Sequence, residues 1–149
     1  MHDYSDITDN IDAIKKMAAQ GDADAQNKIG VCYQEGLSDF PKDYVKAFEW
    51  YSKSAAQGYV KAQFNIACCY LCGMGVETDF KVCLEWYMKI AEQGNTEAMK
   101  TVGFSYEMGI GVEKNVNKAF EWYAKAVELG DKSAKKELKR IKKLLEVTR

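Results

Sequence analysis

The stretch from Gly94 to Gly130 reads GNTEAMKTVGFSYEMGIGVEKNVNKAFEWYAKAVELG, and its pattern recurs along most of the chain. The copies align on four glycines that lie 37, 36 and 36 residues apart, namely Gly21, Gly58, Gly94 and Gly130. An alanine follows each glycine after four residues, and an aliphatic residue follows it after eight. Repetition at a period of this length predicts copies of one small unit, each packed against its neighbours.

Each copy contains the signals of two helices. Ala25, Ile29 and Tyr33 are spaced four residues apart, so they share one face of a first helix, which we call helix A. A glycine suited to a left-handed helix end closes helix A, and an Asp or Asn suited to N-capping precedes a second helix, helix B. The closing glycines are Gly36, Gly73 and Gly109, and the capping residues are Asp43, Asp79 and Asn115.

Helix B carries an aromatic pair in every copy. The sequence Glu-Trp-Tyr occurs at residues 49–51, 85–87 and 121–123. In the first copy, Trp50 and Tyr51 lie three and four residues from Ala47, which is the spacing of a buried helical face. We therefore predict that stacking of neighbouring copies buries both the tryptophans and the tyrosines.

These signals predict an all-α fold. We expect a right-handed α/α solenoid of about three helix-turn-helix repeats similar to tetratricopeptide repeats, with half-repeat caps and about eight helices in all. The chain is expected to form a single domain over residues 1–149. Its predicted parts are an N-terminal capping helix in 1–21, repeats in 22–57, 58–93 and 94–129, and a basic C-terminal capping helix in 130–149.

The turns that follow helix A carry a more specific signature. Two of them read Tyr70-x-x-Gly73-x-Gly75-Val76 and Tyr106-x-x-Gly109-x-Gly111-Val112, and a helix with the Trp-Tyr pair follows each. With this pattern the chain, over about residues 10–145, resembles the Sel-1-like repeat, a relative of the tetratricopeptide repeat with a slightly longer unit. The first repeat departs from the signature, because residues 36–42 lack the second glycine and are one residue longer.

The resemblance implies a protein that binds other proteins. Members of this family look like scaffolds and adaptors in signalling, protein quality control and bacterial–host contact. We therefore expect a non-enzymatic adaptor or scaffold, and its partner to be a protein or peptide.

Composition argues against several other partners and locations. The net charge of −1 gives no general attraction to nucleic acid or to anionic membranes. No run approaches the roughly 20 apolar residues that span a bilayer, and the N-terminus lacks the basic flank and apolar run of a signal peptide. Five cysteines, an odd number, argue against a disulfide framework. We expect a cytoplasmic monomer with free thiols.

Residues suited to catalysis or metal binding are scarce. His2 is the only histidine and lies at the N-terminus, so no histidine triad forms in the body of the chain. The strongest candidate for a redox or metal site is Cys68-Cys69-x-x-Cys72, and the alternative is that these are small packing residues. The motif falls at the C-terminal end of helix A, where the helix dipole disfavours a thiolate, and no second cysteine pair completes a zinc site. We predict no catalytic residue, no metal and no cofactor.

Two other functions are weighed against the adaptor. One is a dedicated inhibitor or immunity protein that neutralises a bacterial enzyme or toxin. The other is a hydrolase, since some cysteine-rich bacterial members of the family are associated with β-lactam binding or hydrolysis. Those members carry a cysteine three residues before the anchor glycine and another five after it. Here the corresponding positions hold Ala55, Gln63, Ala91 and Met99, which disfavours the hydrolase.

The outward positions of helix A predict the binding surface, because helix A lines the concave side of tetratricopeptide-like stacks. Three large apolar residues at these positions, Phe64, Leu71 and Phe104, indicate an interaction patch, unless a one-residue shift in register places them in the core. The candidate partner-binding residues are Asn27, Val31, Gln34, Lys61, Phe64, Cys68, Leu71, Lys100, Phe104, Glu107, Lys136, Arg140 and Lys143.

The C-terminal segment differs from the rest of the chain in charge. Residues 131–149 contain eight basic and three acidic residues, whereas residues 1–130 contain 13 basic and 19 acidic residues. A solubilising end cap explains this excess most simply. An acidic segment of a partner that extends from the cap into the apolar groove is the functional alternative. Nucleic acid is disfavoured, because no aromatic residue lies among these basic residues.

Overall fold

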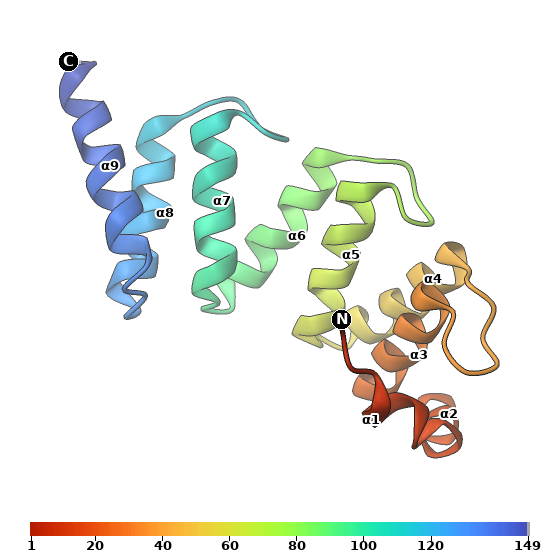
Figure 1. Cartoon of the computed structure of the whole chain (residues 1–149). Helices are drawn as coiled ribbons and strands as arrows, with labels where there is room; N and C mark the ends of the chain where they lie inside the picture. Colours follow the sequence, from red (N-terminus) through yellow and green to blue (C-terminus); the bar gives the residue numbers. More distant parts are fainter. Residues whose placement is uncertain (149) are drawn as a thin grey trace. The chain divides into compact units, whose positions relative to one another are not determined.

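The structure is a computed structural model that describes residues 1–148 (Figure 1). All regular secondary structure in this range is helical, which confirms the all-α prediction, and the helices follow one another as helix-turn-helix repeats. The chain folds as two compact units, Met1–Thr78 and Asp79–Arg149. The boundary falls inside the second repeat, after its helix A and before its helix B.

Unit 1 contains the first repeat and helix A of the second. Along the chain from α2 to α5, each helix packs against the next, so sequence neighbours are also neighbours in space. Here α3 and α4 are helices A and B of the first repeat, and α5 is helix A of the second. The helices are α1 (Ser5–Thr8), α2 (Ile11–Ala19), α3 (Ala23–Glu35), α4 (Tyr44–Ala56) and α5 (Val60–Cys72).

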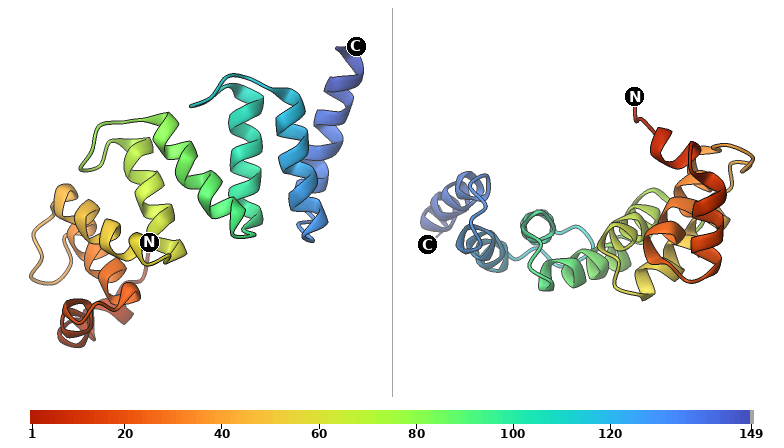
Figure 2. Two further views of the ribbon diagram at one scale, coloured as in Figure 1. Left: turned by 180° about the vertical axis from the view of Figure 1, so that it is seen from behind. Right: turned by 90° about the horizontal axis from the view of Figure 1, so that it is seen from below.

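Unit 2 contains helix B of the second repeat, the third repeat and the basic C-terminal helix. Figure 2 shows α7, α8 and α9 side by side, in agreement with the packing of α7 on α8 and of α8 on α9. The helices are α6 (Phe80–Glu92), α7 (Thr96–Met108), α8 (Val116–Glu128) and α9 (Ala134–Val147). Among residues 1–148, no helix combines the length and the apolar content that a membrane crossing demands.

The predicted helix ends are confirmed. The side chain of Asp43 accepts a hydrogen bond from the amide of Lys46 at the start of α4, and Asp79 and Asn115 cap α6 and α8 in the same way. A glycine with positive φ ends each helix A. These glycines are Gly36, Gly73 and Gly109, with φ of 70°, 69° and 72°.

The described residues form nine helices, one more than predicted. The additional helix is α1, a single turn that precedes the capping helix α2. The side chain of Asp3 accepts a hydrogen bond from the amide of Ser5 at 2.9 Å, and Ile7 is buried in the core of unit 1 beside Ile14. The turn lies outside the repeat pattern, so the comparison of repeats could not reveal it.

The tyrosine of helix B packs on a glycine of helix A in the first and third repeats. Tyr51 is 0% exposed and Tyr123 is 2% exposed, as predicted, whereas Tyr87 of the second repeat is only half-buried, so the prediction was wrong for that tyrosine. A Cβ added at Gly30 would lie 2.5 Å from the ring of Tyr51, and one added at Gly103 would lie 2.9 Å from the ring of Tyr123. Such distances are overlaps, so a glycine is needed for the ring to lie directly on the backbone of helix A.

The neighbouring tryptophans are only half-buried, so the prediction of their burial was wrong. Adjacent helical residues point about 100° apart, so in the first and third repeats the tyrosine that faces helix A turns the preceding tryptophan away from it. A lysine one turn later covers each indole ring in a cation–π contact. The pairs are Trp50 with Lys53, Trp86 with Lys89 and Trp122 with Lys125, with Nζ 4.3, 4.9 and 4.4 Å from the ring centroids.

The turn after helix A contains a second left-handed residue in every repeat. Gly75 and Gly111 have φ of 73° and 71°, and a Cβ at either position would overlap the backbone of the preceding helix B. In the first repeat, Ser38 takes the same place with a φ of 54°. The first repeat therefore keeps a left-handed residue at this position without glycine, although Ser38 adopts a conformation that costs an L-residue free energy.

Side chains hold the longer turn of the first repeat to α2. The Nζ of Lys15 lies 2.8 Å from the carboxylate of Asp39 and 5.0 Å from the ring centroid of Phe40. Phe40 in turn packs edge-on against Tyr33, with ring centroids 4.9 Å apart. The extra residue in this turn thus places an aromatic ring between α2 and α3.

Candidate interaction surface

The predicted partner-binding residues fall on the helices A of both units and on the C-terminal helix α9. We call the set in unit 1 the α3/α5 surface and the set in unit 2 the α7/α9 surface. The α3/α5 surface consists of Asn27, Val31, Gln34, Lys61, Phe64, Cys68 and Leu71, and the α7/α9 surface consists of Lys100, Phe104, Glu107, Lys136, Arg140 and Lys143.

Two amide side chains of the α3/α5 surface form hydrogen bonds with other helices of unit 1. Asn27 is only 7% exposed, and its side-chain oxygen accepts a hydrogen bond from Asn65 of α5 at 2.9 Å. The side-chain oxygen of Gln34 accepts a hydrogen bond from the hydroxyl of the buried Tyr51, also at 2.9 Å. These residues join α3 to α5 and to α4, and Asn27 offers a partner little surface.

The remaining residues of the α3/α5 surface are more accessible. Lys61 and Leu71 are exposed, Leu71 with 44% of its surface. Val31, Phe64 and Cys68 are half-buried. An exposed leucine two turns after a half-buried phenylalanine, on the same face of α5, gives this helix apolar surface that the packing of unit 1 does not fully cover.

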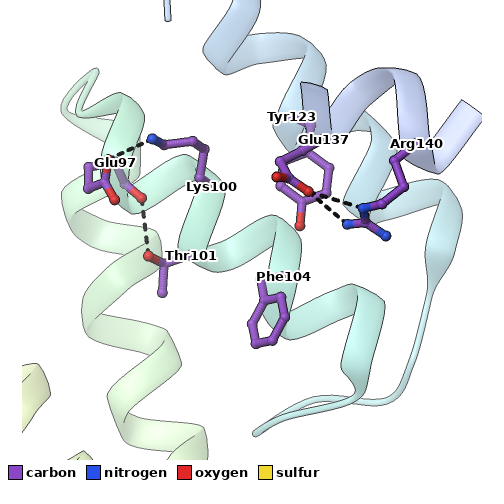
Figure 3. A pocket seen from close by; sticks show the side chains of 7 residues that line it. All are labelled: Glu97, Lys100, Thr101, Phe104, Tyr123, Glu137 and Arg140. Carbon is purple, nitrogen blue, oxygen red and sulfur yellow. Dashed lines mark hydrogen bonds and ion pairs between the residues drawn. The ribbon is translucent and has the colours of Figure 1, made fainter. Parts of the chain in front are cut away.

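The α7/α9 surface contains a shallow pocket of about 390 Å³ (Figure 3). Phe104 lies at its edge with 48% of its surface exposed, and Figure 3 shows its ring set apart from the charged side chains around it. Three helices contribute to the pocket. Its lining consists of Glu97, Lys100, Thr101 and Phe104 from α7, Tyr123 from α8, and Glu137 and Arg140 from α9.

Glu107 is buried behind this pocket, at 8% exposure, in a network of charged groups. The guanidinium of Arg140 donates to both carboxylate oxygens of Glu107, with Nη2 2.7 Å from Oε2 and Nη1 bonded to Oε1. The hydroxyl of Tyr123 donates to the same Oε2 at 3.1 Å. Arg140 also donates to Glu137 through Nε and Nη2, at 3.1 and 2.9 Å. One arginine therefore ties α9 to α7.

The network keeps its charges at neutral pH. The hydrogen bonds from Arg140 hold the pKa of Glu107 below its ordinary value of 4.5, although burial acts in the opposite direction. The same hydrogen bonds raise the pKa of Arg140. Burial is the main reason why the pKa of Tyr123 is raised, so its hydroxyl keeps its proton and remains a donor.

Lys100 makes a second link across the α7/α9 surface. Its Nζ lies 2.7 Å from the carboxylate of Glu97, 3.4 Å from that of Asp131 and 2.7 Å from the hydroxyl of Ser133. The carboxylates of Glu97, the larger cause, and of Asp131 raise the pKa of Lys100. Lys136 and Lys143, on the same face of α9 as Arg140, are exposed.

Three consecutive copies of the Sel1 repeat match the chain, at residues 23–59, 60–95 and 96–131, which is more than half of its 149 residues. The chain belongs to the Sel1 repeat family. Sel1 repeat proteins generally mediate protein–protein interactions, and the repeat is typically a non-enzymatic scaffold. The resemblance inferred from the turn signature and the Trp-Tyr helix is thereby confirmed.

Solved Sel1 repeat structures have the same fold. A Sel1 repeat protein from Oxalobacter formigenes is 35% identical, with a TM-score of 0.77 over 90% of this chain and 55% of its own. Protein c5321, a protective antigen of uropathogenic Escherichia coli with an SLR fold, is 32% identical, with a TM-score of 0.75 over 84% of this chain and 27% of its own. This Sel1 repeat chain thus spans about half and about a quarter of their lengths.

A more distant structure shows the fold alone. Cysteine-rich protein B of Helicobacter pylori is 19% identical, with a TM-score of 0.61 over 87% of this chain and 92% of its own. No curated protein matches this Sel1 repeat chain by sequence.

The five cysteines of this Sel1 repeat protein, all within residues 1–148, form no disulfide bond with one another. Cys69 and Cys72 lie in the last turn of α5, as predicted. Burial raises the pKa of Cys69 to about 12 and that of Cys32 to about 11, so both remain thiols at neutral pH and are poor nucleophiles. Among residues 1–148, no three His, Cys, Asp or Glu side chains gather to hold a metal ion.

Sequence reasoning did not recognise the hydrogen bond that links helix B to this surface. Gln34 and Glu107 both lie 13 residues after an anchor glycine, and both accept a hydrogen bond from the helix-B tyrosine of their own repeat. A polar residue at this position, followed by a tyrosine 17 or 16 residues later, is the signal that could have identified them. The pocket residues Glu97, Thr101, Tyr123 and Glu137 were not predicted either.

Proposed function

We propose that this Sel1 repeat protein is a non-enzymatic adaptor that binds a partner protein or peptide through its helix-A surfaces. The observation that supports this most directly is the exposure of Phe104 and Leu71, at 48% and 44%, on the faces of α7 and α5. Large apolar side chains that intramolecular packing leaves open are typical of interaction surfaces. The family supports the general role, and the choice of surface is our own.

Three polar residues on the same faces differ from Phe104 and Leu71, because their side chains are engaged within the protein. Asn27, Gln34 and Glu107 are occupied by hydrogen bonds within their own unit. The exposed surfaces of Phe104 and Leu71 contribute nothing to the stability of the fold, because contact of apolar area with water is unfavourable in free energy. A partner that covers them would remove this cost.

The test is capture of partners from a native lysate by the wild-type chain and by the variants Phe104→Ala and Leu71→Ala. Matched controls are Leu129→Ala and Val45→Ala, which remove apolar side chains that are 58% and 55% exposed on helix B or at its end. We expect a reproducible partner that is lost with the first two variants and retained by the controls, with unchanged unfolding midpoints. Equal retention by all four variants would rule out the helix-A surfaces.

We further propose that the protein acts in the bacterial cytoplasm as a monomer, without nucleic acid or lipid partners. The net charge of −1 and the bacterial origin of the solved relatives support this. Light scattering after size exclusion should give the mass of a single chain. A dimer that dissociates on Phe104→Ala would instead make a second copy the partner.

A further inference from the structure

The distribution of charge on unit 2 carries an inference that deepens the proposed function and rests on it. Helix α9, from Ala134 to Val147, contains six basic and two acidic residues. Arg140 is shared by Glu107 and Glu137, so its charge is balanced within unit 2. Among residues 1–148, the five lysines of this helix have no such counter-charge. These are Lys135, Lys136, Lys139, Lys142 and Lys143.

This arrangement is unfavourable for the helix itself. Lys135 and Lys139, Lys136 and Arg140, and Lys139 and Lys143 are like charges four residues apart, a spacing at which they destabilise a helix. The only acidic residue in the first turn of α9 is Glu137, which Arg140 already engages. A basic surplus of this size is a positive patch that a counter-charged partner would complement.

The positive patch adjoins the exposed apolar residue of the same unit. Phe104 and Arg140 line one pocket, and Lys136 and Lys143 lie on the face of α9 that carries Arg140. The Arg140 network leaves the pocket wall balanced in charge, which suits an apolar group. The flanking lysines are free to meet carboxylates.

We propose that the α7/α9 surface binds an acidic segment of a partner protein, with a large apolar side chain of that segment on Phe104 and its carboxylates opposite Lys136 and Lys143. Lys143 follows Lys136 by seven positions, which places the two lysines about 10 Å apart along the helix. An extended chain covers that distance in about three residues. The segment therefore carries acidic residues about three positions apart, next to an aromatic or aliphatic residue.

The test begins with a random 16-residue peptide library displayed on phage and selected on the wild-type chain. Enriched peptides are expected to be net negative, with an aromatic or aliphatic residue near their acidic positions. The best peptide is then synthesised, and its affinity is measured with wild type and variants. Lys136→Glu/Lys143→Glu should weaken binding by at least about tenfold, and Phe104→Ala by about thirtyfold, the effect of a typical hot spot.

The matched control is Lys135→Glu/Lys142→Glu, which changes the charge of α9 by the same amount on a different face. It should weaken binding by less than about threefold, because distant charges act mainly on the rate of association. Equal losses with both double variants would mean that only net charge matters and would overturn the proposal. Circular dichroism confirms that each variant is folded.

The other outcomes separate this inference from the proposed function. Binding that needs Phe104 or Leu71 but is indifferent to Lys136 and Lys143 would overturn the acidic partner and leave the adaptor role standing. No enriched peptide dependent on either apolar residue would count against both. Stronger binding to vesicles with anionic lipid than to the acidic peptide, lost with Lys136→Glu/Lys143→Glu, would make the partner a membrane and overturn the proposal.

Discussion

Tyr51 of unit 1 and Tyr123 of unit 2 occupy equivalent positions, but their hydroxyls meet different acceptors. Both rings lie on a glycine of helix A. The hydroxyl of Tyr51 donates to the neutral Gln34, whereas that of Tyr123 donates to Glu107, whose charge is balanced by Arg140 of α9. The same packing is thus completed once by a neutral hydrogen bond and once by an ion pair. The packing of the tyrosine ring on a glycine is common to these two repeats, whereas the acceptor of the tyrosine hydroxyl differs between them.

The second repeat differs from both in sequence. Ala67 stands where the first and third repeats have Gly30 and Gly103, and Leu71 stands where they have Gln34 and Glu107. At these positions the second repeat therefore lacks both the glycine on which the tyrosine ring packs and the polar residue that accepts the hydrogen bond of the tyrosine hydroxyl in the other two repeats. The position of the acceptor instead carries one of the apolar side chains to which we assign partner binding.

The largest effect is expected from a methyl group under the tyrosine rings. Alanine in place of a helical glycine normally stabilises a helix by about 1 kcal/mol. Gly30→Ala should instead destabilise unit 1 by about 2 kcal/mol, because its Cβ would overlap the ring of Tyr51. Gly103→Ala should cost somewhat less. Urea unfolding followed by circular dichroism measures both. Combination with Tyr51→Leu should recover part of the loss, and a stabilising Gly30→Ala would show that the ring is not held on the backbone.

Removing the charge of Glu107 should produce the next largest effect. Glu107→Gln makes unit 2 resemble unit 1 and leaves Arg140 paired with Glu137 alone, at an expected cost of about 2 kcal/mol. The control is Glu137→Gln, which removes the more exposed partner of Arg140 and should cost less than about 1 kcal/mol. Chemical denaturation of the two variants in parallel decides the order. Equal losses of unfolding free energy in the two variants would mean that the burial of Glu107 does not strengthen its ion pair with Arg140.

The ion pair also predicts a pH dependence that differs between the units. The folded pKa of Glu107 lies below its ordinary value of 4.5, so its contribution is complete above that value. As the pH falls below 4.5 and through the lowered pKa, Glu107 becomes protonated in the folded state and the contribution is lost. Hydrogen exchange should show α7 and α9 losing protection between pH 5 and about pH 3 in wild type. The loss should be smaller in Glu107→Gln, and an identical loss would assign it to other carboxylates.

The network of unit 2 should be transferable to unit 1. Gln34→Glu alone should destabilise unit 1 by about 1 kcal/mol, because it places a carboxylate beside Tyr51 without a counter-charge. Cys68 occupies in α5 the repeat position that Arg140 occupies in α9, so Cys68→Arg supplies the missing partner. A double-mutant cycle should give a favourable coupling of about 1 kcal/mol. Additive effects would indicate that the side chains of α3 and α5 do not reach each other as those of α7 and α9 do.

The smallest effect concerns the turn of the first repeat. Ser38 has a φ of 54°, where the other repeats have glycine. Ser38→Gly should raise the unfolding free energy by about 0.5 kcal/mol, since relief of the left-handed strain is partly offset by the greater entropy of glycine in the unfolded chain. Thermal unfolding detects such a shift. The reverse change Gly75→Ser should be clearly more costly, because a Cβ there overlaps the backbone of α4.

The parts of the fold that follow from local rules could be predicted from the sequence. Asp43, Asp79 and Asn115 cap their helices as expected, because an N-cap depends on a few neighbouring residues. The repeat register predicted exposed positions for Phe64, Leu71 and Phe104; Leu71 and Phe104 are exposed, and Phe64 is half-buried. These features need no knowledge of how two helices are rotated against each other.

Other features depend on that rotation and were not predicted. The half-burial of Trp50 and its counterparts is fixed by Tyr51 facing helix A, and both residues looked equally suited to the core. The pairing of Glu107 with Arg140 joins residues 33 positions apart whose side chains meet only when α9 packs on α8. In the list of candidate binding residues, Glu107 therefore appeared as an open surface charge.

The half-buried tryptophans have a spectroscopic consequence. Each repeat contains one indole ring, and each ring has a lysine ammonium against its face. Iodide should therefore quench their fluorescence more effectively than caesium, since the ammonium attracts an anion and repels a cation. Because these rings are only half-buried, two of them can be replaced by phenylalanine at modest cost. The one that is left then reports the unfolding of its own repeat, so three single-tryptophan proteins would resolve, repeat by repeat, the order in which the chain comes apart.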